Sequence, residues 1–254
     1  MPAHPPLTLL WRDERLVAVY KPAGWLVHRT GLDAGETRIV LQALRAQLGG
    51  RHVYPVHRLD KGTCGVLLLA LDPEAARGLA TAFERRQVDK RYLALVRGWA
   101  PPAAEVDHAL APDDAPDGAA PQPAFTRVRR LACLSLDASA DPRFPTTRAS
   151  LVEAMPETGR RHQVRRHLKH LSHPIVGDAT HGKGPLNRWW AQRLGRQRLW
   201  LHAWSLSFEH PGSGERLTLG SGLVPRGAAP ADAHAPEDLR AWQALLATLP
   251  WQHD

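Results

Sequence analysis

Cysteine is scarce in this chain, and long apolar runs are absent. Only Cys64 and Cys133 occur among 254 residues, too few for a disulfide scaffold or a four-cysteine zinc site, which favours a reducing compartment. No stretch approaches the roughly 18 uncharged apolar residues that a membrane-spanning helix needs. The first thirty residues lack a basic start followed by an apolar core, so no secretory signal is expected. The sequence therefore predicts a cytoplasmic protein.

Acidic residues are too few to balance the basic ones. Asp and Glu number 25 against 33 Lys and Arg, which gives a formal net charge of +8. The segment 158–200 holds ten basic residues and one acid, whereas 101–123 holds five acids and no Lys or Arg. This segregation predicts one basic face for a polyanionic partner, most often a nucleic acid. The alternative is a solvated basic face without a partner.

Apolar periodicity predicts strands and helices that do not alternate strictly. The length allows one large domain or two small ones. Residues 100–123, rich in Ala, Pro and Asp, are expected to form an exposed insertion, and 221–235 a second irregular stretch. The mixture favours an α+β fold with a largely antiparallel sheet. Predicted strands cover 7–11, 15–20, 64–71, 90–97, 124–137, 147–155, 199–208 and 215–219; predicted helices cover 37–48 with Thr37 as the cap, a segment from Pro73 with Ala76, Leu79, Ala80 and Phe83 buried, 160–171 and 236–248.

The first candidate for chemistry is the string His57-Arg58-Leu59-Asp60-Lys61-Gly62-Thr63. It lies in a turn-prone stretch directly before 64–71, whose continuous apolar character predicts a strand buried on both faces. A carboxylate on a loop that a rigid strand supports is well placed for catalysis. The alternative is that Asp60-Lys61-Gly62 is only a turn.

The second candidate is the segment Thr158–Leu168, which is rich in Arg and His. Projected at 100° per residue, Val164, Leu168 and Leu171 form a buried stripe, and Arg165 borders it. A buried guanidinium needs a carboxylate partner, because an unpaired one costs several kcal/mol. Asp60 is one candidate partner, and a structural acid such as Glu153 is the alternative.

Histidine and tyrosine side chains add two further candidates. His162, His167, His170 and His173 cluster in the sequence, but on the helical projection the first three diverge, which disfavours a metal site. Histidines that face RNA or are satisfied in the core are the preferred interpretation. Tyr92 lies on a predicted strand, where it could stack on a base and exchange a proton, or could simply be a core tyrosine.

These stretches together resemble the pseudouridine synthases of the RluA-type branch. The resemblance covers about residues 8–220 and depends on five motifs in the family's order. Further strings resemble the TruC-type subgroup, which isomerises uridine 65 of certain tRNAs. The branch motifs are His57-Arg58-Leu59-Asp60 with Gly65, Lys90–Ala94, Thr158–His167, His173–Asp178 and Leu201-His202-Ala203; the subgroup strings are Gly24–Arg29, Pro145-Thr146-Thr147-Arg148 and Arg165–His170.

The resemblance implies a fold, a reaction and a set of site residues. It implies a mixed, mostly antiparallel sheet flanked by helices and loops around a central RNA-binding cleft. The catalytic domain would span 7–220, and 221–254 would form a C-terminal extension with a short helix. The family's reaction breaks the uracil N1–C1′ bond, turns the base and rejoins it through C5, without cofactor or metal. The resemblance assigns catalysis to Asp60, Tyr92 and Arg165 and RNA binding to Arg58, His57, Arg160, His162, Arg166 and Lys169.

The implied partner is RNA, with tRNA as the substrate that the subgroup strings indicate, and the expected state is a monomer. A pseudouridine synthase acting on large-subunit ribosomal RNA is the main alternative. A catalytically dead RNA-binding module and a metal-dependent hydrolase using the histidines are alternatives of other classes. The chain departs from the family in having Cys64 where Ser is usual, and no additional N-terminal RNA-binding domain is expected before residue 7.

Overall fold

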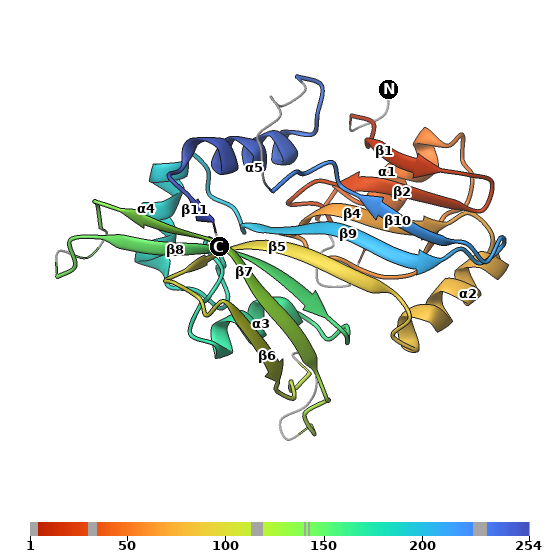
Figure 1. Ribbon diagram of the computed structural model, residues 1–254. Coiled ribbons are helices and arrows are strands. Elements are labelled where there is room, and N and C mark those ends of the chain that lie inside the picture. Colours follow the sequence, from red (N-terminus) through yellow and green to blue (C-terminus); the bar gives the residue numbers. More distant parts are fainter. Residues whose placement is uncertain are drawn as a thin grey trace. The chain divides into compact units, whose positions relative to one another are not determined.

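The computed structural model describes residues 5–29, 35–112, 119–139, 141, 143–225 and 233–253. Its contacts divide the chain into two compact units, which we call unit 1 (Met1–Lys90 with Ala203–Ala244) and unit 2 (Arg91–His202 with Leu245–Asp254). The chain passes between them within strands β5 (Asp89–Arg97) and β9 (Leu201–Glu209) and within helix α5 (Glu237–Thr248) (Figure 1).

Unit 1 contains an antiparallel sheet with helices. Its strand order is β1-β2-β4-β9, with β10 paired to β9 and the short β3 paired to β4. Every residue of β4 is buried, as the continuous apolar run predicts. Side chains of β2 and β4 pack with Leu79 of α2 and Phe208 of β9 in one hydrophobic cluster. The elements are β1 (Leu9–Arg12), β2 (Leu16–Lys21), α1 (Val40–Gln47), β3 (Tyr54–Pro55), β4 (Cys64–Ala70), α2 (Pro73–Glu84) and β10 (Arg216–Gly220).

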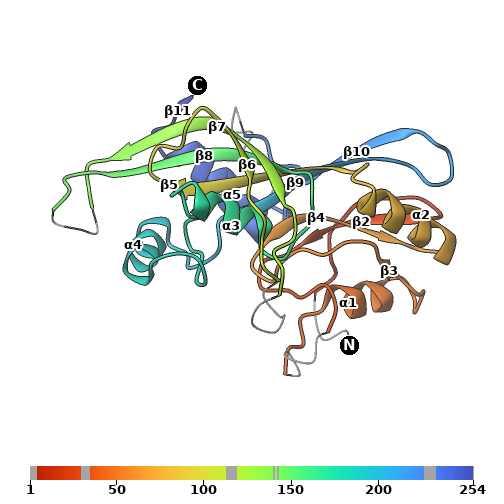
Figure 2. The same ribbon diagram turned by 90° about the horizontal axis from the view of Figure 1, so that it is seen from below.

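Unit 2 contains a second set of antiparallel strands, in the order β5-β8-β7-β11, with β6 paired to β7. Helix α3 lies against β8, as Figure 2 shows. Its Val164 and Leu168 enter a cluster with Val96 and Val152. The remaining elements are β6 (Ala103–Asp107), β7 (Phe125–Leu136), β8 (Thr147–Pro156), α3 (Gln163–His170), α4 (Gly184–Leu194) and β11 (Gln252–His253).

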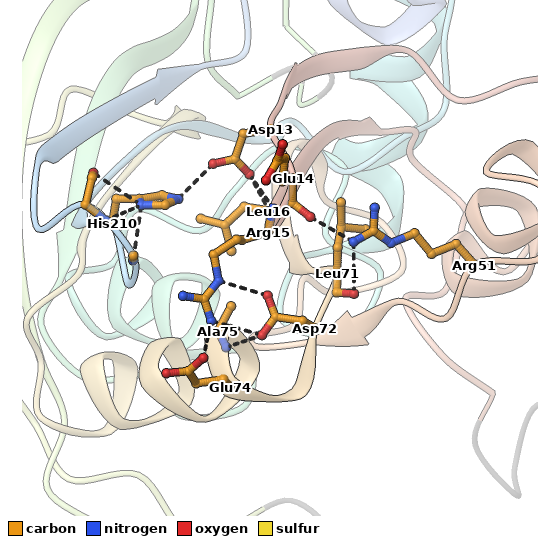
Figure 3. Close-up of polar contacts among 12 residues, drawn as sticks. Asp13, Glu14, Arg15, Leu16, Arg51, Leu71, Asp72, Glu74, Ala75 and His210 are labelled. Carbon is orange, nitrogen blue, oxygen red and sulfur yellow. Dashed lines mark hydrogen bonds and ion pairs between the residues drawn. The ribbon is translucent and has the colours of Figure 1, made fainter.

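Helix α2 begins as its sequence predicts. Asp72 has extended backbone, and its carboxylate accepts a hydrogen bond from the Ala75 amide at 2.8 Å, while Pro73 follows at the first helical position. Arg15 binds the same carboxylate and also Glu74, as Figure 3 shows. The buried face is shifted from the prediction: Ala75 is buried, whereas Ala80 is exposed.

Helix α1 begins three residues later than predicted, and Thr37 does not cap it. The residue before the helix is Ile39, whose extended backbone forms a parallel bridge with Leu26. The amides of Val40 and Leu41 donate to the carbonyls of Leu26 and Val27. Pairing with this neighbouring segment therefore satisfies amides at the start of the helix, in place of a side-chain cap.

The prediction of a loop over 100–123 is wrong at its beginning. Residues 103–107 form strand β6, which pairs with β7, and Leu110 forms an isolated bridge with Gln122. Residues 113–118 of that predicted insertion, and 226–232 of the second irregular stretch, lie outside the described residues. Helix α4 was not predicted at all. The α+β class with a mostly antiparallel sheet is confirmed.

Candidate active site

Asp60 lies in the loop between β3 and β4, and its side chain is partly exposed. The loop turns at this point, because the Asp60 carbonyl accepts a hydrogen bond from the Thr63 amide at 3.0 Å. Leu59 is 6% exposed and anchors the loop in the core of unit 1. The predicted turn and the predicted placement before a buried strand are therefore both present.

A buried lysine supports the same loop. Lys21, at the end of β2, is fully buried, and its ammonium donates to three backbone carbonyls. Two of them belong to Lys61 and Thr63, at 3.2 and 2.6 Å, and flank the turn that follows Asp60. Three acceptors match the three N–H donors of an ammonium, which offsets the cost of burying the charge. Lys21 was not among the predicted site residues, although the polar end of an apolar strand at Lys21-Pro22 is a signal for it.

His57 attaches the start of the loop to β4. Strand β3 pairs Tyr54 with Ala70 and Pro55 with Leu69, and then leaves the ladder. The Leu68 amide donates instead to His57 Nε2 at 3.0 Å. The imidazole also stacks on Phe83, with 4.8 Å between ring centroids. Burial, followed by the charge of Lys90, lowers the pKa of His57 to about 3, so the ring is neutral at pH 7 with Nε2 as an acceptor.

Gly65 permits a close approach between two strands of unit 1. Its φ of +114° is a conformation that L side chains rarely adopt, and a Cβ there would lie 2.1 Å from the carbonyl oxygen of Ala203 in β9. Only glycine fits this position without a shift of the backbone. Cys64, which departs from the family pattern, is fully buried next to it.

Arg165 in unit 2 pairs with an acid that the sequence analysis did not consider. Its guanidinium is 8% exposed and binds Asp178 in a bidentate manner, with Nε–Oδ2 and Nη2–Oδ1 both at 2.8 Å. The Asp178 carboxylate also accepts from the amides of Thr180 and His181. Burial raises the pKa of Asp178, but the hydrogen bonds from Arg165 and the backbone outweigh it and leave that pKa below its usual range.

The alternative that Arg165 pairs with Glu153 is wrong. Glu153 is buried, and its carboxylate binds the guanidinium groups of Arg91 and Arg129 at 3.2 and 2.6 Å. A structural acid does accompany Arg165, as that alternative held, but the acid is Asp178.

Tyr92 lies on β5 of unit 2, opposite Ala154 of β8. Its ring is partly buried and packs against the cluster that contains Val164 and Leu168. Tyr92 and helix α3, which carries Arg165, thus contribute to one hydrophobic cluster of unit 2, whereas Asp60 belongs to unit 1.

The predicted RNA-binding residues of unit 2 surround the start and the outer face of α3. Gln163 organises this turn, because its Oε1 accepts from the Arg160 amide and the Thr158 hydroxyl. His162 has a left-handed backbone with φ of 54°. Arg166 donates to the Ala111 carbonyl at 2.7 Å. Lys169 is exposed; in unit 1, Arg58 is exposed as well.

The histidines divide into separate environments. His167 is fully buried and places one ring nitrogen 2.9 Å from Thr126 Oγ1 and the other 3.0 Å from the His108 carbonyl. His162 instead approaches His181, with ring nitrogens 3.4 Å apart. Among the described residues, no group of three or more His, Cys, Asp or Glu could hold a metal ion. In the same part of the chain, no helix has the length and apolarity to cross a membrane.

Sequence comparisons give consistent matches. A model of the RNA pseudouridylate synthase family matches residues 15–170. The chain is 48% identical over 220 residues to "tRNA pseudouridine synthase C" of Yersinia pestis, covering 84% of this chain and 85% of that protein. It is 43% identical over 253 residues to the protein of the same name from Vibrio cholerae, covering 97% of both.

Solved structures give the same result for the fold. Human RNA Pseudouridylate Synthase Domain Containing 4 superposes with a TM-score of 0.67 at 26% identity, covering 96% of this chain and 94% of that one. Human RNA Pseudouridylate Synthase Domain Containing 1 superposes with a TM-score of 0.66, also at 26% identity, covering 88% and 85%.

Proposed function

Because the chain belongs to the RNA pseudouridylate synthase family, we propose that it is an isomerase that converts uridine to pseudouridine in tRNA. The observation that carries the proposal is the 48% identity to proteins named tRNA pseudouridine synthase C, over about 85% of both chains. The segregated basic residues of 158–200 suit a polyanionic substrate.

We propose uridine 65 as the target position. The strings Gly24–Arg29 and Pro145–Arg148, which resemble the subgroup that modifies this position, support the choice. The alternative substrate is large-subunit ribosomal RNA. Transcripts of tRNA and of large-subunit RNA, each with tritium at C5 of uridine, separate the two, since tritium is released only from the true substrate.

Asp60 is the proposed catalytic carboxylate. It attacks the ribose or the base, or promotes the loss of a ribose proton, while the N1–C1′ bond breaks and the base turns. The C5–C1′ bond then forms, and the C5 proton leaves as N1 is protonated. By the end of the reaction the bond to the Asp60 carboxylate has broken, or the ribose proton has returned, so the free carboxylate is regenerated. Tyr92 stacks on the uracil and acts as the base that removes the C5 proton. Arg165 is proposed to hold the Asp60 carboxylate ionised and oriented.

RNA binding is assigned to Arg58, Arg160, His162, Arg166 and Lys169, all of which can meet phosphate or base groups. The target uridine must leave its stack to react, at a cost of a few kcal/mol. Arg58 is proposed to fill the vacated space. For His57 the hydrogen bond to Leu68 and the stack on Phe83 support a positioning role in place of an RNA contact.

We further propose that the enzyme acts as a monomer in the cytoplasm, with neither cofactor nor metal. Pseudouridine formation should then be unchanged in a chelator, and the activity per chain should not depend on protein concentration. A loss of activity in the chelator would contradict the metal-free mechanism.

Asp60→Asn is the direct test of the assignment. The substitution keeps the shape of the side chain and removes its charge, so we expect no pseudouridine and an unchanged Kd for tRNA. Tritium release and filter binding measure the two quantities. Glu74→Gln, at an exposed position of helix α2, is a matched control that should remain active. Substantial turnover by the Asn variant would refute the role of Asp60.

A further inference from the structure

An exposed tryptophan and an arginine form a flat stack on unit 2. Trp99, in the connection between β5 and β6, is 44% exposed. Arg148 is the second residue of β8, and its guanidinium carbon lies 4.2 Å from the centroid of the Trp99 ring. Arg148 is exposed as well. Tryptophan is highly buried on average, and its large ring is enriched at interaction sites.

The backbone holds this pair in a fixed position. The indole Nε1 donates to the Leu134 carbonyl at 3.1 Å. On one side of Trp99, the Gly98 amide donates to the Arg148 carbonyl at 2.8 Å. The Ser150 hydroxyl donates to the Gly98 carbonyl and accepts from the Ala100 amide, at 2.9 and 3.0 Å. The ring is thus presented by β7 and β8 at little further cost in conformational entropy.

We propose that Trp99 and Arg148 form a stacking platform for RNA, a proposal that rests on the proposed function. An indole face accepts any nucleobase, and an adjacent guanidinium can stack on a base or bind a phosphate. Among the described residues, no carboxylate is paired with Arg148, so its charge is available to a polyanion. A protein partner with an acidic surface is the competing occupant and is an outcome of the test.

The platform lies away from the proposed chemistry. Strand β5 continues for five residues beyond Tyr92 and ends at Arg97, which corresponds to roughly 16 Å, and Trp99 follows after the turn at Gly98. A nucleotide on Trp99 therefore lies several positions from a uridine on Tyr92. The platform contributes to RNA affinity and to the choice of RNA, and it leaves the rate of pseudouridine formation in the bound complex unchanged.

Three variants test the platform by their Kd for tRNA. Trp99→Leu should raise the Kd about tenfold, since stacking of one base is lost. Trp99→Phe keeps a ring and should stay within about threefold of the wild type. Arg148→Met should raise the Kd and reduce the slope of log Kd against log salt by about one. The kcat at saturating tRNA should be unchanged in all three.

Leu9→Ala and Arg77→Met serve as matched controls, because they remove an exposed apolar group and an exposed charge from unit 1. Both should bind tRNA like the wild type. If Trp99→Leu lowers the melting temperature, the Kd of Arg148→Met still tests the platform, because the Arg148 side chain is exposed and its replacement should leave the fold intact. Wild-type Kd values for folded Trp99→Leu and Arg148→Met would overturn the platform and leave a protein as the occupant. A wild-type enzyme that binds tRNA without forming pseudouridine would instead refute the proposed function.

Discussion

His57 shows how a single side chain can hold a loop in place, in this case the loop that carries the proposed catalytic Asp60. Its Nε2 accepts the Leu68 amide next to the point where β3 stops pairing with β4. Without that acceptor, a buried backbone N–H would be unsatisfied, at a cost of about 1–3 kcal/mol. The loop that carries Asp60 begins at this contact, so a change here moves the carboxylate.

His57→Phe should therefore lower kcat about tenfold while KM for tRNA stays the same, since small misplacements of a reacting group are costly. The new ring keeps the stack on Phe83 and loses the acceptor. His57→Gln places a carbonyl oxygen where Nε2 was and should recover most of the rate. Steady-state kinetics on tRNA measure both constants. Equal kcat values for the wild type and the Phe variant would exclude a positioning role.

The contacts of the site residues show which features of the site can be predicted from a single sequence and which cannot. The turn at Asp60 and the buried strand after it could be predicted from neighbouring residues, because a turn before a continuous apolar run is a local pattern. The partner of Arg165 could not be predicted in this way. The sequence holds 25 acidic residues, and the pairing with Asp178 follows only from the three-dimensional fold. Lys21 is likewise 40 residues from Lys61, whose carbonyl it binds. Burial of Arg165 could be predicted from helical periodicity, but its partner could not.

At the scale of elements, Asp72 couples a helix to a turn. It caps α2 through the Ala75 amide and pairs with Arg15, which follows the turn between β1 and β2 (Figure 3). The hydrogen bond from Arg15, followed by that from the backbone, lowers the pKa of Asp72 from 3.8 to about 2. A depressed folded-state pKa stabilises the protein above pH 3.8, and this contribution is lost as the pH falls towards 2.

Asp72→Ala should lower the free energy of unfolding by about 1–2 kcal/mol at pH 7, since it removes the cap. Asp72→Asn keeps a capping oxygen and loses only the charge. Because the ion pair with Arg15 is partly exposed, the decrease in the free energy of unfolding should be smaller for this variant. Denaturant unfolding at pH 7 and near pH 3 measures both. The difference in the free energy of unfolding between the wild type and the Asn variant should be smaller at the lower pH. A gap that widens in acid would contradict the assignment of that pKa to Asp72.

The elements that were predicted share a clear local signal, and those that were missed lack one. The wholly apolar β4 and the Asp72-Pro73 start of α2 were evident in the sequence. Helix α4 has only Trp190 fully buried and no apolar stripe, so its periodicity gives little indication of a helix. Strand β6 exists because β7 offers a pairing edge, and its own sequence is rich in Ala and acidic residues.

At the scale of the whole molecule, the excess of positive charge is concentrated in one stretch. Ten basic residues against one acid in 158–200 give a local charge of +9, larger than the net charge of the entire chain. Helices α3 and α4 carry half of these ten basic residues, and Lys169, Arg188 and Arg193 are exposed on them. Exposed cations of this kind release counterions when they meet phosphates.

The triple variant Lys169→Gln, Arg188→Gln, Arg193→Gln should therefore weaken tRNA binding and flatten its salt dependence. Each lost phosphate contact reduces the slope of log Kd against log salt by roughly 0.7–0.9, so the three together should reduce it by about 2. The control removes the same charge from unit 1, by replacing the exposed Arg12, Arg77 and Arg85 with Gln. Filter binding from 50 to 300 mM salt gives both slopes. Equal slopes for the two triple variants would mean that affinity follows the net charge of +8, and that 158–200 forms no dedicated RNA-binding face.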